Sequence, residues 1–430
     1  MSKHFLNVVF NESFSVIFTK KKQIMNRILQ VVVSLMFVNF VSMGAGSVNG
    51  QVEVVNAVWV MNEGGSIEVP SVGVYNPTEA TFTQVMEFEG AGFTTDVIIA
   101  DGAAFAAADN MIYRFDLDTY EVEASVEMEG VRKLAYYEGA IYATRGEYDS
   151  ETWGSVEFET YFVWFNSETL LWEGELPATE GVGFDAEGLV VKNGFAYIAI
   201  NHAFTWGDEV GLLGVYDLES GEYEEYDLGE EGKNPVHLKV TENEVLMVNN
   251  TDWSATSLSR VELPSLGASE SLVTTMTVAG VSSACNAATL IGDELVFQIE
   301  NETGMRKASV SDLTPSPEMW GPATDVYYSM AVNPVNGNVY ATVTNFVDAA
   351  EVQILDVSGN LISSFQAGAI PGGMAFDVRT VVGITHLDMF EVSRVVGEFD
   401  LMGRVWAKGN KGVKIETMSD QTTRVSYVAE

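Results

Sequence analysis

Cysteine and proline are scarce in this chain of 430 residues, which has one cysteine, Cys285, and ten prolines. A single cysteine excludes an intramolecular disulfide, so packing alone must hold the fold together. Because a lone cysteine in a β-rich chain is more often a small apolar residue than a nucleophile, we expect Cys285 to be inert and in a core. The few prolines, and the lack of Ser, Gln or Pro tracts, indicate short linkers and no low-complexity segment.

Long apolar runs are also missing. The run from Ile28 to Met43 has 16 residues, fewer than the roughly 18 expected of a membrane-spanning helix. It follows Arg27 and precedes small residues, which is the pattern of a secretory signal peptide. We therefore expect residues 1–50 to be a signal peptide region, with translation starting at Met25 or with a long basic segment before it. We predict a secreted or cell-surface protein without a transmembrane span. Because no cysteine follows the apolar run, we also expect no lipid anchor.

Positive charge is scarce as well. The chain has 22 Lys and Arg against 61 Asp and Glu, a formal net charge of −39. Without residues 1–50 the counts are 17 and 60, a net charge of −43. Such a surface repels polyanions, so we expect no nucleic acid partner and no binding to anionic membranes. The acidity suits solubility, a salty habitat or cation binding.

Motifs for common catalytic chemistries are not found. The sequence has no Gly-rich phosphate loop, no His-Glu-x-x-His and no Gly-x-Ser-x-Gly. Paired carboxylates such as Asp116 and Asp118 fall at predicted strand ends and turns, where solvated acidic residues are usual. The sequence therefore favours a non-enzymatic protein over an enzyme.

What the chain does contain is a repeated hairpin. The stretch "MAVNPVNGNVYATVTNF" (330–346) has apolar segments on both sides of an Asn-Gly turn, which predicts strand, turn, strand. The same order of parts recurs at five earlier places: 97–110, 133–147, 188–202, 237–250 and 288–301. A second hairpin follows each copy, as in "GVYDLESGEYEEYDL", so each unit should hold four strands.

The spacing of the units predicts an all-β fold, a seven-bladed β-propeller over residues 51–380. Predicted second strands end 36 to 56 residues apart, at Asn62, Asp109, Arg145, Asn201, Asn249, Glu300 and Asn345. The first unit lacks a clear first strand, and "GGMAFDV" (372–378) is predicted to supply it and close the ring. A pair of β-sandwiches is the competing fold, but it would not give so regular a period.

Propeller topology predicts a binding face. The start of strand one and the end of strand two lie on the same face of every blade, next to the central channel. From these positions and the aromatic residues after them we predict ligand-binding residues: Asn62, Glu63, Arg145, Trp153, Asn201, His202, Trp206, His237, Asn249, Trp253, Glu300 and Asn345. The starts of strand one add Arg132, Lys233, Asn286 and Tyr328.

Two interpretations of this set remain open. Amides with exposed aromatic rings suit a large, flat or sugar-like ligand, because rings stack and amides both donate and accept hydrogen bonds. Alternatively, the tryptophans cover the ends of blade cores and the asparagines serve turns.

A metal site is a weaker expectation. Calcium is the candidate ion, with oxygen ligands from Glu63, Asn201, Asn249 and Glu300. His202 and His237 with Glu300 could hold a transition metal, but their spacing matches no recognised motif.

Three stretches resemble a known family. "VWVMNEGG", the last unit with "YYSMAVNPVNGNVYATVTNFVDAAEVQILDVSGNLISSF", and "GAIPGGMAFD" are similar to YncE-like secreted seven-bladed propellers of Bacteroidota, over roughly residues 55–378. Some members look like surface propellers that capture cobalamin for an outer-membrane transporter. The resemblance implies a non-enzymatic binding protein, monomeric, with a corrinoid as candidate ligand and a transporter or another protein as candidate partner.

The last residues resemble a second module. "VVGEFDLMGRVWAKGNKGVKIETMSDQTTRVSYVAE" (395–430) is similar to the end of type IX secretion sorting domains, so residues 381–430 are expected to form a short C-terminal β module. The resemblance implies export across the outer membrane. The alternative functions are a calcium-dependent propeller hydrolase or lactonase and a protein-binding scaffold.

Overall fold

The computed structural model describes residues 51–65, 68–263 and 273–382, the strands at 395–400, 412–418 and 423–428, and Val405. Contacts divide the chain into two units, one made of residues 53–380 and the other of the residues before and after them. The expected signal region, residues 1–50, lies outside the described residues. Within the described part, no helix is long and apolar enough to cross a membrane.

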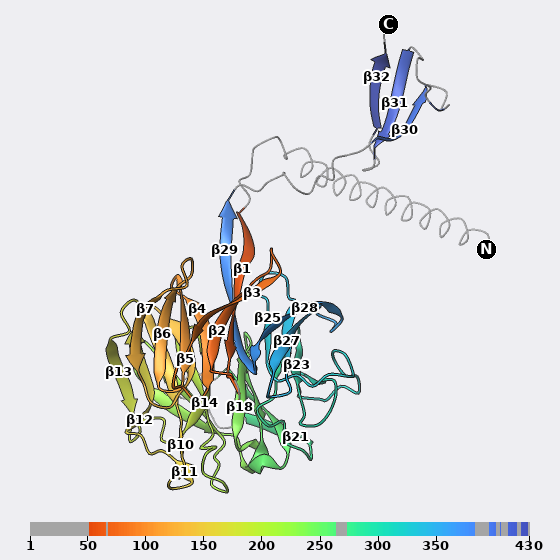
Figure 1. Cartoon of the computed structure of the whole chain (residues 1–430). Helices are drawn as coiled ribbons and strands as arrows, with labels where there is room; N and C mark the ends of the chain where they lie inside the picture. Colours follow the sequence, from red (N-terminus) through yellow and green to blue (C-terminus); the bar gives the residue numbers. More distant parts are fainter. Residues whose placement is uncertain are drawn as a thin grey trace, which may run out of the picture. The chain divides into compact units, whose positions relative to one another are not determined.

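Residues 53–380 form a seven-bladed β-propeller, as the repeat predicted (Figure 1). The first three blades, from the channel outward, are β29 (Pro371–Val382), β1 (Gln51–Asn62), β2 (Ser71–Asn76) and β3 (Thr81–Glu87); β4 (Thr94–Ala100), β5 (Ala103–Ala108), β6 (Met111–Asp116) and β7 (Val122–Glu127); and β8 (Val131–Tyr137), β9 (Ala140–Arg145), β12 (Thr160–Asn166) and β13 (Trp172–Pro177).

The next two blades also have four strands, and each has a short 3₁₀ helix near it in sequence. They are β14 (Ala186–Lys192), β15 (Phe195–Ile200), β16 (Leu212–Asp217) and β17 (Tyr223–Asp227); and β18 (Pro235–Val240), β19 (Glu244–Asn249), β20 (Thr256–Glu262) and β21 (Val273–Ala279). The 3₁₀ helices are η1 (Glu230–Gly232) and η2 (Thr251–Trp253).

The last two blades differ in strand number. The sixth is β22 (Ala288–Ile291), β23 (Glu294–Phe297) and β24 (Arg306–Ser309), and the seventh is β25 (Met330–Val332), β26 (Val339–Val343), β27 (Ala349–Leu355) and β28 (Leu361–Ala369). The prediction of four strands in every unit is therefore wrong for the sixth blade. There, isolated bridges from Trp320 to Met305 and from Pro315 to Ala308 take the place of a fourth strand.

The ring closes where the sequence predicted. β29 contains the predicted segment 372–378 and is the innermost strand of the first blade, next to β1. Segments more than 300 residues apart in sequence therefore share one sheet. This pairing covers the inner edge of β1, which would otherwise invite pairing with another chain.

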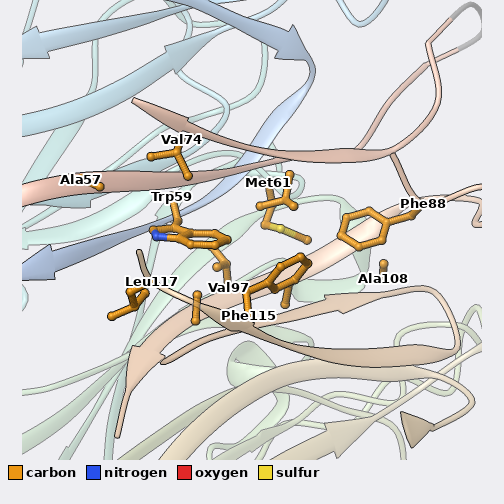
Figure 2. Packing of buried hydrophobic residues seen from close by; sticks show 12 residues of the cluster. Ala57, Trp59, Met61, Val74, Phe88, Val97, Ala108, Phe115 and Leu117 are labelled. Atoms are coloured by element: carbon orange, nitrogen blue, oxygen red, sulfur yellow. The ribbon is translucent and has the colours of Figure 1, made fainter. Parts of the chain in front are cut away.

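The core is seven separate apolar clusters, one between each pair of neighbouring blades. Successive strand residues point to opposite sheet faces, so a strand between two such clusters must be apolar throughout. In β1, Trp59 and Met61 pack against the second blade, whereas Val58 and Val60 pack against the seventh. Figure 2 shows the first of these clusters, where Trp59 lies 5.5 Å from the Phe115 ring, centroid to centroid.

Two small sheets lie outside the blades. The hairpin of β10 (Tyr148–Asp149) and β11 (Gly154–Ser155) is inserted between β9 and β12. In the C-terminal unit, β30 (Val395–Asp400), β31 (Gly412–Met418) and β32 (Thr423–Val428) form a three-stranded antiparallel sheet. The other residues of the 395–430 segment lie outside the described part, apart from Val405.

Candidate functional site

Four consecutive innermost strands are irregular near their first residues. The pairing register shifts within Thr94–Asp96 of β4, Val131–Leu134 of β8, Ala186–Leu189 of β14 and Pro235–His237 of β18. A β-bulge breaks the strict alternation of side chains and re-aims them, and bulges are common near binding sites. The irregular stretches contain polar and charged residues: Thr95, Arg132, Lys133 and Glu187.

These residues form one charged cluster at the start of the innermost strands, here called the channel cluster. Arg132 Nε donates to Glu187 Oε2 at 2.7 Å. Lys133 Nζ donates to the Thr95 carbonyl at 2.7 Å and lies 3.8 Å from Glu187 Oε1. Burial alone would raise the pKa of Glu187, but the charges of Arg132 and Lys133 lower it below its usual value. Glu187 is therefore held as a carboxylate.

Glu63 and Tyr328 add a second carboxylate and a phenol to the channel cluster. The Tyr328 hydroxyl lies 2.9 Å from each Glu63 carboxylate oxygen. Burial raises the pKa of Glu63, against the opposing effects of the Tyr328 hydrogen bond and of Lys133 and Arg132. Burial and the Glu63 charge raise the pKa of Tyr328. Gly372 makes room for this pair, because a Cβ atom there would lie 2.0 Å from Glu63 Oε1.

His237 and Cys285 complete the mouth of the channel. His237 Nε2 lies 2.6 Å from the Asn286 carbonyl, and a carbonyl only accepts, so Nε2 holds the proton. Burial, followed by the charge of Lys239, lowers the pKa of His237 to about 4, so the ring is neutral at pH 7. Cys285 is exposed, which corrects the expectation of a core cysteine. The surrounding protein and the Glu187 charge nevertheless raise its pKa to about 11.

Four of the predicted site residues are structural. Asn62 Nδ2 donates to Ser71 Oγ, and Asn249 Nδ2 donates to the Ser257 and Ser259 hydroxyls, so both amides point along their blade and away from the channel. Arg145 donates to the carbonyls of Glu129 and Thr160 and stacks 3.8 Å from the Phe158 ring centroid. Asn201 is buried. Each of the four side chains is thus buried or has partners within the protein, and ligand contact by them stays a prediction that rests on strand-end positions alone.

Three other predicted residues belong to interlocked loops of the third and fourth blades. Ser155 N donates to Thr205 Oγ1 at 3.2 Å, which joins the β10–β11 hairpin to the loop that contains His202 and Trp206. Trp153 and Trp206 are 79% and 81% exposed, so neither covers a blade core. The alternative interpretation, in which the tryptophans cover the ends of blade cores, therefore does not hold for Trp153 and Trp206.

Ser155, Asp185 and His202 are close together but lack the geometry of a nucleophilic triad. The Ser155 hydroxyl donates to Asp185 Oδ2, and His202 Nδ1 lies 3.1 Å from the same oxygen and 3.3 Å from Ser155 Oγ. A triad needs one ring nitrogen on the serine and the other on the carboxylate. Here one nitrogen faces both, so the group fastens two loops together.

The remaining predicted residues lie on loops of the last three blades. Trp253 is half-buried in η2, and Glu300 is exposed. Asn345 Oδ1 accepts from the amides of Val347 and Asp348, which is a turn role, as the alternative interpretation expected.

The four residues predicted to bind calcium do not surround one point, because the Asn249 amide points into its own blade. In the described part of the chain, no group of three or more His, Cys, Asp or Glu side chains could hold a metal ion. His202 and His237 have different partners and do not form the suggested pair.

Sequence reasoning missed Lys133, Glu187, Asp96 and Lys239. Each is a charged residue inside an apolar first strand, as in "VRKLAYY" and "PVHLKV". A charge in a strand that is otherwise buried on both faces could have marked them, since such a charge must face a channel or a partner.

One cavity lies away from this cluster. It has a volume of about 480 Å³ and lies where the ring closes, between β3 and β28, with Glu68, Phe82, Glu87 and Gly368 in its lining. None of the predicted site residues lines it. The channel cluster, where charges and shifted pKa values gather, is the stronger candidate.

No protein-family model and no curated protein matches this chain. Among solved structures, the chain is similar to the β-propeller domain of Cps50 (Swd1) from Myceliophteria thermophila. The two are 11% identical, the match covers 69% of this chain and 96% of that one, and the TM-score is 0.47.

Proposed function

We propose that this protein is an exported, non-enzymatic binding protein that takes a small or medium-sized ligand at the channel mouth. The observation that supports it most is the channel cluster: Glu63, Arg132, Glu187, His237 and Cys285 come from five blades, and their charges affect one another's pKa. Such convergence of charged groups with partly exposed side chains suits recognition of a polar ligand.

The chemistry of these groups supports binding over catalysis. The Cys285 thiol has a raised pKa, whereas a nucleophilic thiol needs a lowered one. The Ser155 hydroxyl donates to Asp185, and the His202 nitrogen near it also faces Asp185, so the three do not have the arrangement of a triad. A corrinoid is the first ligand to test, because the family resemblance of the sequence includes cobalamin-capturing propellers.

Calorimetric titration of the full chain with cobalamin tests this function. We expect saturable binding that Glu63→Gln weakens about tenfold, since this removes a charge from the mouth. Glu219→Gln is the matched control, because Glu219 is exposed in the turn after β16, at the opposite end of the blade. Equal weakening by both variants, or no heat with cobalamin, would reject the corrinoid as ligand.

Export rests on the apolar run after Arg27 and on the 395–430 segment. If that segment is a sorting signal, its deletion should leave the protein in the periplasm, as measured by fractionation and surface labelling. Surface display that survives the deletion would contradict this part of the proposal.

A further inference from the structure

One cation of the propeller has no hydrogen-bond or ion-pair partner among the residues that the structure describes. Residues 53–380 contain 53 Asp and Glu but only 11 Lys and Arg, all of the latter within the described ranges. Ten of the 11 bind a carboxylate or a carbonyl: Arg114, Arg132, Lys133, Arg145, Lys192, Lys233, Arg260, Arg306, Lys307 and Arg379. The Lys239 side chain alone makes no hydrogen bond or ion pair in the described part of the chain.

Lys239 lies in the channel beside His237. The two residues are two positions apart on β18, so their side chains point to the same face of the strand. Leu238 and Val240, which alternate with them on β18, pack in the core between the fourth and fifth blades, so His237 and Lys239 point away from that core. Charges of the third and second blades, Lys133 and Asp96, act on Lys239, which places its side chain on the channel side. A separation of two residues places Lys239 about 7 Å further along the strand, beyond the mouth.

The surroundings of Lys239 leave its charge poorly balanced. Burial lowers its pKa, the charge of Lys133 lowers it further, and Asp96 is the anion that opposes them. Asp96 is itself occupied, since its Oδ2 accepts from the Leu134 amide at 2.8 Å, and burial raises its pKa. Keeping an unpaired ammonium inside a channel is costly unless something else neutralises it.

We propose that Lys239 binds an oxyanion, a carboxylate or phosphate group of the ligand, with Lys133 as the second cation. The proposal deepens the proposed function, since it assigns a chemical group to the part of the ligand that enters the channel. The acidic surface repels a free anion, and the cations Arg132 and Lys133 at the mouth partly offset this repulsion.

Binding should be linked to proton uptake. An anion next to Lys239 raises the pKa of His237, which faces Lys239, Lys133 and Glu187, and that of Lys239, which faces Lys133 and Asp96. It also raises the pKa of Glu63, Asp96 and Glu187. All these changes have the same sign, so affinity for an anion that keeps its own charge over this interval increases as the pH falls from 7 toward 5.

Calorimetric titration of the full chain with sodium phosphate and, separately, sodium acetate tests the proposal. We expect saturable binding of at least one anion. Acetate, which stays mostly ionised at pH 5.5, should bind more tightly there than at pH 7, whereas phosphate itself loses negative charge between these pH values. If only phosphate binds, the ligand group at Lys239 is a phosphate. If acetate binds, the group is a carboxylate. No saturable binding of either would overturn the proposal.

Three variants locate the site. Lys239→Met should weaken anion binding about tenfold or more, whereas Lys239→Arg keeps the charge and should restore it. Lys192→Met is the matched control, because Lys192 Nζ is already bonded to the Thr241 carbonyl, and it should change affinity less than about twofold. Thermal melting of each variant checks folding, and Lys239→Met should fold well because it removes a desolvated charge.

Equal binding by wild type and Lys239→Met would overturn the assignment to Lys239. The outcome is separate from that of the proposed function: cobalamin binding that depends on Glu63 could persist without any anion binding, and anion binding could persist without cobalamin.

Discussion

At the scale of single residues, Cys285 shows how a channel changes a side chain. Cys285 is exposed, yet the protein around its sulfur limits solvation of the thiolate. This desolvation, followed by the Glu187 charge, raises the pKa of the thiol to about 11. Exposure alone would suggest a reactive cysteine. Because the thiolate is the reactive form, the raised pKa should make it slow instead.

We therefore expect Cys285 to react with iodoacetamide at pH 8 on the order of a hundredfold more slowly than glutathione. The rate should keep rising toward pH 11, because only there is half of the thiol ionised. Mass spectrometry reads this directly, since the chain has no other cysteine. In urea the rate should match that of glutathione, and a native rate equal to the unfolded one would contradict the raised pKa.

The candidate site was partly predictable at this scale. Glu63 and His237 were predicted from strand ends and lie in the channel cluster. Asn62 and Asn249 were predicted from the same rule and point along their blades instead. The rule locates the backbone, whereas side-chain direction near a strand end depends on bulges and on hydroxyl groups of the next strand, which come from residues far along the chain.

At the scale of elements, β29 is the strand on which the ring depends. It comes from the end of the propeller sequence and supplies the inner edge of the first blade. Its Gly372 also admits the Glu63 carboxylate beside Tyr328. Closure and the channel cluster therefore share one strand.

A chain that ends at Ile370 lacks β29 and should lose the ring. We expect a melting temperature lower by about 10 °C or more, and aggregates in size-exclusion chromatography, because β1 then presents an unpaired edge. A chain that ends at Val382 keeps β29 and is the matched control. It should stay monomeric and melt near the full chain. Equal melting of the two truncated chains would show that β29 does not close the ring.

At the scale of the whole molecule, the excess of negative charge opposes folding. The propeller has 53 acidic and 11 basic side chains, and eight of the basic ones already form ion pairs among the described residues. Most carboxylates therefore repel one another without compensation. Salt screens this repulsion, as the Debye length falls from about 30 Å at about 10 mM to about 3 Å at about 1 M.

The melting temperature at pH 7 should therefore rise by several degrees between low and high sodium chloride. At pH 4, near the ordinary pKa of carboxyl groups, many carboxylates are neutral and the same salt series should have a smaller effect. A melting temperature that is independent of salt at pH 7, followed by circular dichroism, would contradict the repulsion argument.

The all-β class, the number of blades and the closure by residues 372–378 could be predicted from the sequence, because short apolar runs, turn residues and a repeat are local signals. Only the tertiary structure decided which polar residues meet. Lys133, Glu187 and Lys239 come from three blades, and register shifts in their strands or in neighbouring strands bring their charges together. Such convergence depends on the angle between blades, which no local stretch of sequence encodes.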